Sequence, residues 1–112
     1  MTAPAPPPAI TLIGAPTDVG GGARGASMGP EALRVAGLVE ALRALGAEVQ
    51  DAGNLAGPPN PGLPPVQGFR HLAEVTAWNQ AVHDAVLAEL QQGRLPILLG
   101  GDHCLAIGSI SA

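Results

Sequence analysis

The chain of 112 residues contains no lysine and no tyrosine, and it has one cysteine, one tryptophan and one phenylalanine. A single cysteine excludes an internal disulfide and a metal site built from several thiolates, and it fits a reducing cytoplasm. Five arginines stand against nine acidic residues, which gives a net charge of −4. This balance argues against a surface that binds nucleic acid or an anionic membrane, and we expect neither as a partner.

Long hydrophobic runs are also absent. No apolar stretch approaches the roughly 18 residues that would predict a membrane span. Residues 1–8 carry four prolines and no positively charged residue, so they do not form a signal peptide and are expected to be an extended, mobile leader. Hydrophobic side chains make up 46% of the chain, which excludes a mainly disordered protein. The length fits one modest domain or part of a larger one.

Strand-like and helix-like segments alternate along residues 9–112. The apolar runs at 9–15 and 95–99 are typical of strands buried on both faces, and residues 47–52 predict a weaker strand. Pro30 and Glu31 suit the start of a helix that ends at Gly46. Its predicted apolar face consists of Val35, Leu38, Val39, Leu42 and Leu45. A second helix is predicted over residues 70–92 and the opening of a third over residues 105–112.

This order predicts an α/β fold, an open parallel sheet with right-handed crossovers and helices on both faces. Residues 53–68 carry five prolines and interrupt the alternation as a long surface loop. Within the second helix, Trp78 either forms a contact surface or covers this loop. Asn79 requires a hydrogen-bond partner, for which a backbone carbonyl is the first candidate. His71 and His83 are interpreted as surface or packing residues.

The first candidate site is the segment that follows the strand at 95–99. In an open α/β sheet, ligands bind beyond the carboxyl ends of the strands. Gly100 and Gly101 allow a sharp turn there, from which Asp102 and His103 project. Imidazole ligates first-row metals and a neighbouring carboxylate can orient it, but an ordinary turn with a solvated histidine fits the same spacing. Cys104 is expected to be a small, partly buried residue rather than a nucleophile.

The second candidate site is the glycine-rich segment at residues 20–25, which satisfies the pattern G-x-G-x-x-G. A dinucleotide site needs these glycines between a strand and the helix that directly follows it, whereas here the helix begins only at Pro30. Asp51 also lies 31 positions after Gly20, against roughly 20 in the fingerprint. The segment is therefore interpreted as a flexible loop or one that flanks a substrate.

Two motifs carry a family resemblance. The segment Gly100–Ser109, GGDHCLAIGS, resembles the signature G-G-D-H-S-x-x-x-G-S/T of the ureohydrolases, the binuclear-manganese family of arginase and agmatinase. The segment Arg24–Leu38, RGASMGPEALRVAGL, resembles the arginase form R-G-x-x-x-G-P-x-x-L/I/M-R-x-A-G-L/V. Together with the elements between them, the motifs extend the resemblance over residues 9–112. The residues of the second motif favour arginase over agmatinase, and so does the run GRLP before the last strand.

The resemblance implies a three-layer α/β/α fold and two Mn²⁺ ions at the strand ends. It also implies a bridging hydroxide that attacks the guanidinium carbon of L-arginine and releases L-ornithine and urea. His103 matches a metal ligand of the family, and Asp102 is assigned an orienting role beside it. No residue matches a catalytic or substrate-binding position. A cytoplasmic homo-oligomer, a trimer or hexamer, is implied for the intact enzyme.

The chain departs from the family in what it lacks. The later motifs D-A-H-x-D and D-x-D-x-x-D-P are absent, and Cys104 replaces the usual serine. We therefore expect residues 9–112 to be the N-terminal part of an arginase that is truncated and inactive alone. The alternatives are an agmatinase-type or other guanidino ureohydrolase, and a non-catalytic α/β module that completes its sheet with a partner chain.

Overall fold

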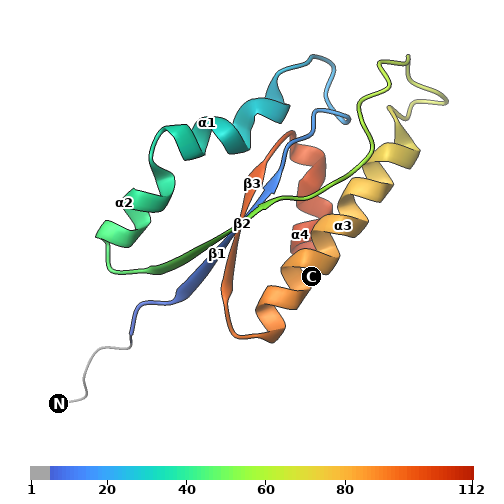
Figure 1. Ribbon diagram of the computed structural model, residues 1–112. Helices are drawn as coiled ribbons and strands as arrows, with labels where there is room; N and C mark the ends of the chain where they lie inside the picture. The colour runs from blue at the N-terminus through green and yellow to red at the C-terminus, as the bar shows by residue number, and fades with distance from the viewer. Residues whose placement is uncertain (1–5) are drawn as a thin grey trace.

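The computed structural model describes residues 6–112 and contains one three-stranded parallel sheet with helices on both faces (Figure 1). Strand β1 spans Ala9–Ala15, β2 spans Glu48–Asn54 and β3 spans Leu95–Gly100. Their order is β2-β1-β3, so the first strand of the chain is the central one. The predicted α/β class is confirmed. Most of the predicted leader lies outside the described residues, and residues 6–8 are exposed and form no helix or strand.

Strand β1 is buried on both of its faces, as its almost wholly apolar sequence predicts. Ile10 and Leu12 belong to one core cluster, whereas Ile13 and Ala15 belong to another on the opposite side. This division follows from the period of two residues along a strand. Two hydrophobic layers therefore hold the sheet, one against the helices between β1 and β2 and one against the helices that follow β2.

The segment between β1 and β2 corrects the sequence prediction of one helix from Pro30 to Gly46. It contains the 3-10 turn η1 (Ala26–Met28), helix α1 (Gly29–Val35) and helix α2 (Leu38–Ala44). The break occurs at Gly37, whose φ of +93° is left-handed and ends the helical ladder. Val35 and Leu45, predicted on the buried face, are 87% and 83% exposed. Of the predicted apolar face, only Leu38, Val39 and Leu42 of α2 pack against the sheet.

Helix α3 (Leu72–Gln91) covers the other face, together with the 3-10 turn η2 (His103–Leu105) and helix α4 (Ala106–Ser111). Val82 and Val86 of α3 are buried against β1. The Asn79 side chain donates to the Val75 carbonyl (3.0 Å) and accepts from the Gly108 amide (2.7 Å). The predicted carbonyl partner is confirmed, and the second contact joins α3 to α4.

A polar network is centred on the buried Thr11, near the N-terminal end of β1. Thr11 is fully buried in β1, and its hydroxyl donates to Glu89 (2.8 Å) and accepts from Arg94 Nε (2.6 Å). Arg94 and Glu89 also form an ion pair at 3.3 Å. Every polar atom of the threonine side chain is therefore satisfied, which buried polar groups require.

No helix in residues 6–112 has both the length and the hydrophobicity needed to cross a bilayer.

Candidate functional site

The candidate site lies where β1 and β3 end side by side. Ala15 and Gly100 are paired in the sheet register, so the loops that follow both strands start at the same edge. Backbone hydrogen bonds connect these loops: the Asp102 amide donates to the Thr17 carbonyl (3.0 Å), and the Gly101 amide donates to the Ala26 carbonyl (3.3 Å). The two predicted candidate segments are thus parts of one structure.

The turn after β3 depends on Gly101. Its φ is +76°, and a Cβ atom at this position would lie 2.6 Å from the Ala15 carbonyl oxygen and 2.6 Å from the Leu105 side chain. A larger residue would therefore be strained by its backbone conformation and crowded by its neighbours. The predicted sharp turn at Gly100 and Gly101 is confirmed, and it directs the chain back over the end of β1.

Asp102 joins the two loops through its carboxylate. Oδ1 accepts from the Cys104 amide (2.9 Å), which makes Asp102 the N-cap of η2. Oδ2 accepts from the Gly20 amide (2.9 Å), 82 residues earlier in the chain. Charge-assisted hydrogen bonds of this kind are about twice as strong as neutral ones. The carboxylate therefore fixes the turn that carries His103, and no hydrogen bond joins it to the His103 ring in the described chain.

His103 is exposed at the first position of η2, directly after the capping aspartate. Its ring makes no hydrogen bond to any other residue of 6–112, so within the described chain neither ring nitrogen has a protein partner. Across these same residues, no group of three or more histidine, cysteine or acidic side chains is arranged to hold a metal ion. The described chain therefore supplies one nitrogen donor at this edge and not a whole metal site.

Cys104 is half-buried beneath the glycine-rich loop, as expected for a small packing residue. Burial raises the pKa of its thiol to about 12, with further contributions from the hydrogen bond and the negative charge of Asp102. The thiol is therefore protonated at neutral pH, and since the thiolate is the reactive form, these surroundings oppose a nucleophilic role.

The buried Asp18 side chain anchors the glycine-rich loop through hydrogen bonds. Its carboxylate accepts from the Asn60 side chain (2.8 Å) and from the Gly25 amide (3.1 Å). These two hydrogen bonds lower the pKa of Asp18, with a smaller contribution from the charge of Arg24. Asp18 thus ties the glycine-rich loop to the proline-rich loop.

His71 makes a second connection between the same two loops. Its Nδ1 lies 2.7 Å from the Val19 carbonyl oxygen, and because a carbonyl only accepts, Nδ1 carries a proton. Its Nε2 lies 3.0 Å from both the amide nitrogen and the carbonyl oxygen of Leu63. His71 is therefore a packing residue, as predicted, but its bracing role was missed, because no local pattern links positions 19, 63 and 71.

Trp78 of α3 covers the proline-rich loop, which confirms the second of its two sequence interpretations. The side chain is 4% exposed, and its Nε1 donates to the Pro58 carbonyl (2.8 Å). Gly57 lies against the indole ring, where a Cβ atom would collide with it. The loop is thereby packed onto α3.

The nucleotide-binding interpretation finds no support in the geometry. The Gly20 amide is engaged by Asp102, and the glycine-rich loop does not lead directly into α1. Asp51, the acidic residue of the proposed fingerprint, forms a bidentate pair with Arg34 at 2.8 and 3.0 Å. A ribose hydroxyl would have to displace this pair.

Comparison with known proteins agrees with both motifs. The profile of the arginase family matches residues 8–112. The arginase of Brucella melitensis is 40% identical over 100 residues, which cover 88% of this chain and 32% of that protein. The arginase of Staphylococcus aureus (strain COL) is 37% identical over 113 residues, covering 93% of this chain and 35% of that protein.

Solved structures show the same fold. The native arginase of Bacillus caldovelox superposes with a TM-score of 0.84 at 38% identity, covering 93% of this chain and 36% of that one. The Entamoeba histolytica arginase in complex with L-ornithine gives a TM-score of 0.81 at 27% identity, covering 94% and 35%. The chain thus spans about a third of the length of the relatives it matches. On the family match and these relatives together, the chain belongs to the arginase family.

Proposed function

We propose that this chain supplies part of the active site of an arginase-type hydrolase. The whole protein would hydrolyse L-arginine to L-ornithine and urea. The observation that carries the proposal is the position of His103. Its exposed ring stands on a turn clamped by Asp102, at the carboxyl edge of a parallel sheet, where α/β proteins bind their ligands. The family match supports the reaction class.

In this proposal His103 is a ligand of manganese, and Asp102 is a positioning residue. The exposed imidazole fits one coordination position, whereas both oxygens of Asp102 are occupied by backbone amides. Bound manganese would supply a hydroxide nucleophile near neutral pH. Because Mn²⁺ favours oxygen donors with some imidazole, the remaining ligands in this proposal are mainly carboxylates, with at most one further histidine, and they come from outside the described residues.

The proposal extends to the setting of the whole enzyme: a cytoplasmic homo-oligomer, a trimer or hexamer, acting on the small molecule L-arginine. The substrate assignment is supported by relatives that are named arginases, and the cytoplasmic assignment by a single free cysteine.

A second candidate function is a non-catalytic module that completes its sheet with a partner chain. Two observations favour it. Among the described residues the outer edge of β3 has no neighbouring strand. Ile107 and Ile110 of α4 are also 69% and 84% exposed, which leaves apolar surface for a partner.

A chimera separates the two candidates. Residues 8–112 replace the matched third of the Bacillus caldovelox arginase, and urea release from L-arginine is measured with added Mn²⁺. We expect activity from the chimera and none from the 112-residue chain alone. His103→Ala should lower kcat of the chimera by at least about 100-fold, because a metal ligand is lost.

The matched control is His83→Ala, which removes a histidine whose ring, within residues 6–112, hydrogen-bonds only to Ser111 in α4 (3.1 Å). This variant should keep the activity of the parent chimera. A folded chimera that releases no urea, or one in which His103→Ala is as active as His83→Ala, would reject the assignment and favour the non-catalytic module.

A further inference from the structure

A cavity of about 470 Å³ lies beyond the carboxyl ends of β1 and β2. Pro16, the residue after β1, and Leu55, the residue after β2, both line it. Its volume is within the roughly 300–1,000 Å³ of pockets that hold small molecules. Neither Asp102 nor His103 lines it, so the function proposed above does not use this cavity.

One wall of the cavity is apolar and held in place by protein contacts. Trp78 belongs to the core cluster on the α3 side of the sheet, and Leu55 packs against that cluster. The Trp78 indole donates to the carbonyl of Pro58, which also lines the cavity, and the Leu55 amide donates to the Gly14 carbonyl (2.8 Å). A site with walls fixed in this way loses little conformational entropy on binding, which favours affinity.

A negative charge lies in the same cavity. Asp18 is buried and forms part of the lining. Its carboxylate accepts from Asn60 (2.8 Å) and from the Gly25 amide (3.1 Å), and because these bonds lower its pKa, it is ionised at neutral pH. A carboxylate has about four lone-pair sites, of which these two bonds occupy two. Each oxygen of Asp18 can therefore accept a further hydrogen bond from a ligand.

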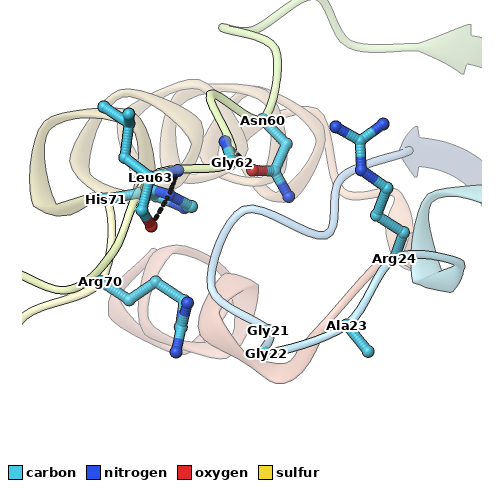
Figure 2. A pocket seen from close by; sticks show the side chains of 9 residues that line it. All are labelled: Gly21, Gly22, Ala23, Arg24, Asn60, Gly62, Leu63, Arg70 and His71. Carbon is cyan, nitrogen blue, oxygen red and sulfur yellow. Dashed lines mark hydrogen bonds between the residues drawn. The ribbon is translucent and has the colours of Figure 1, made fainter.

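A positive charge faces the cavity from the glycine-rich loop. Arg24 lines the cavity, and its charge contributes to the lowered pKa of Asp18. Within residues 6–112 Arg24 forms no ion pair and no side-chain hydrogen bond, so the two charges lie near each other without contact. One terminal nitrogen of Arg24 lies 3.9 Å from the position that a Cβ atom would take at Gly62. Figure 2, a view into the adjoining smaller cavity, shows the Arg24 guanidinium group on the Asn60 side of the glycine-rich loop, apart from Arg70.

We propose that this cavity binds a free α-amino acid with an apolar side chain, its ammonium group on Asp18 and its carboxylate on Arg24. Both charged groups of such a ligand are attached to one carbon, so they can meet two protein charges that lie near each other. The planar fork of a guanidinium group matches a carboxylate with two parallel hydrogen bonds. The half-buried Ser27 hydroxyl also lines the cavity and has no hydrogen-bond partner in the described chain, so it is available to the ligand.

The opposite charges of the cavity select against ligands that carry only one charge. A simple anion on Arg24 would be repelled by Asp18, and a simple cation on Asp18 would be repelled by Arg24. Only a ligand with both charges satisfies both side chains. The apolar wall formed by Leu55, Pro58 and Trp78 then receives the side chain of the amino acid.

The test is a titration of the isotope-labelled 112-residue chain at neutral pH, with a chelator to remove metal ions, followed by NMR. The indole N–H of Trp78, the only tryptophan, reports on the apolar wall, and the side-chain amide of Asn60 reports on the polar side. L-Leucine is compared with isoamylamine, which lacks its carboxylate, and with isocaproate, which lacks its ammonium group. We expect saturable shifts with L-leucine at a Kd on the order of 1 mM. The Kd of each analogue should be at least about tenfold higher, because each loses one charge-assisted contact.

Two variants assign the contacts. Arg24→Gln should raise the Kd of L-leucine about tenfold without raising that of isoamylamine, and Asp18→Asn should raise it about tenfold without raising that of isocaproate. The controls Arg43→Gln on α2 and Asp84→Asn on α3 make the same changes of charge elsewhere and should leave the Kd unchanged. Circular dichroism confirms that each variant compared is folded. Because Asp18 also joins two loops, Arg24→Gln decides the question if Asp18→Asn does not fold.

The proposal is overturned if L-leucine gives no saturable shifts, or if either analogue binds as tightly as L-leucine. It is also overturned if Arg24→Gln weakens the binding of L-leucine no more than Arg43→Gln does. Because the titration is free of metal and leaves His103 intact, its outcome is independent of the chimera experiment. Binding of L-leucine together with an inactive chimera would reject the proposed hydrolase alone.

Discussion

Replacing Asp102 with asparagine removes one half of the clamp between the two strand ends. An amide has one acceptor oxygen, so only one of the Gly20 and Cys104 amides keeps its partner, and the other faces an NH₂ donor. A hydrogen bond to a charged group contributes about 1.5–3 kcal/mol, and the low end applies because Asp102 is only half-buried. We therefore expect Asp102→Asn to lower the free energy of unfolding by about 2 kcal/mol.

The assay is urea denaturation of the 112-residue chain, followed by the fluorescence of Trp78. This residue is the only tryptophan, and its burial makes it sensitive to loss of the packed state. The midpoint should fall while the slope with urea concentration stays constant. The control Asp84→Asn changes an exposed carboxylate that, in the described part of the chain, accepts only from Gln80 on α3, a pair of a few tenths of a kcal/mol. If Asp102→Asn were no more destabilising than Asp84→Asn, the clamp would have no energetic role.

Three further predictions concern other contacts. Hydrogen bonds lower the pKa of Asp18 in the folded chain, so its carboxylate stabilises the fold fully above the pKa of the unfolded chain, and this stabilisation is lost as the pH is lowered through the folded pKa. Asp18→Asn should therefore flatten the decline of the urea midpoint below about pH 4, and an unchanged pH profile would contradict this. Thr11→Val removes the hydroxyl that donates to Glu89 and accepts from Arg94, and although these two keep their ion pair, it should cost about 1–3 kcal/mol in urea denaturation; a gain in stability would refute the network. Trp78→Phe loses the bond to the Pro58 carbonyl and should speed amide exchange in residues 55–60; unchanged exchange would show that the loop is held elsewhere.

The architecture was predictable because its signals are local. A strand buried on both faces must be largely apolar, and β1 is, with Thr11 as its exception. The expectation of the same burial for β3 is wrong for the described residues: β3 is apolar but lies at the edge of the sheet, and most of its residues are only partly buried. The break between α1 and α2 was not predictable from spacing, since the apolar positions continue through Gly37 as in one helix. The left-handed conformation of Gly37 became visible only in the structure, and it explains why Val35 and Leu45 are exposed.

The candidate site was predicted in part. Because ligands bind beyond strand ends in α/β sheets, the sequence predicts a site at the turn that carries His103. The contact of Asp102 with Gly20 spans 82 residues, and that of His71 with Val19 spans 52. Such contacts depend on the register of the parallel strands and on the path of the loops, and no periodicity in the sequence encodes them.

If His103 is a metal ligand at the edge where β1 and β3 end, its loss must lower the number of bound metal ions. The most direct test is the number of Mn²⁺ ions bound per subunit of the chimera, measured by metal analysis after equilibrium dialysis. We expect two ions in the parent chimera and in His83→Ala, and loss of at least one ion in His103→Ala. Retention of two ions by His103→Ala, with unchanged affinity, would contradict it.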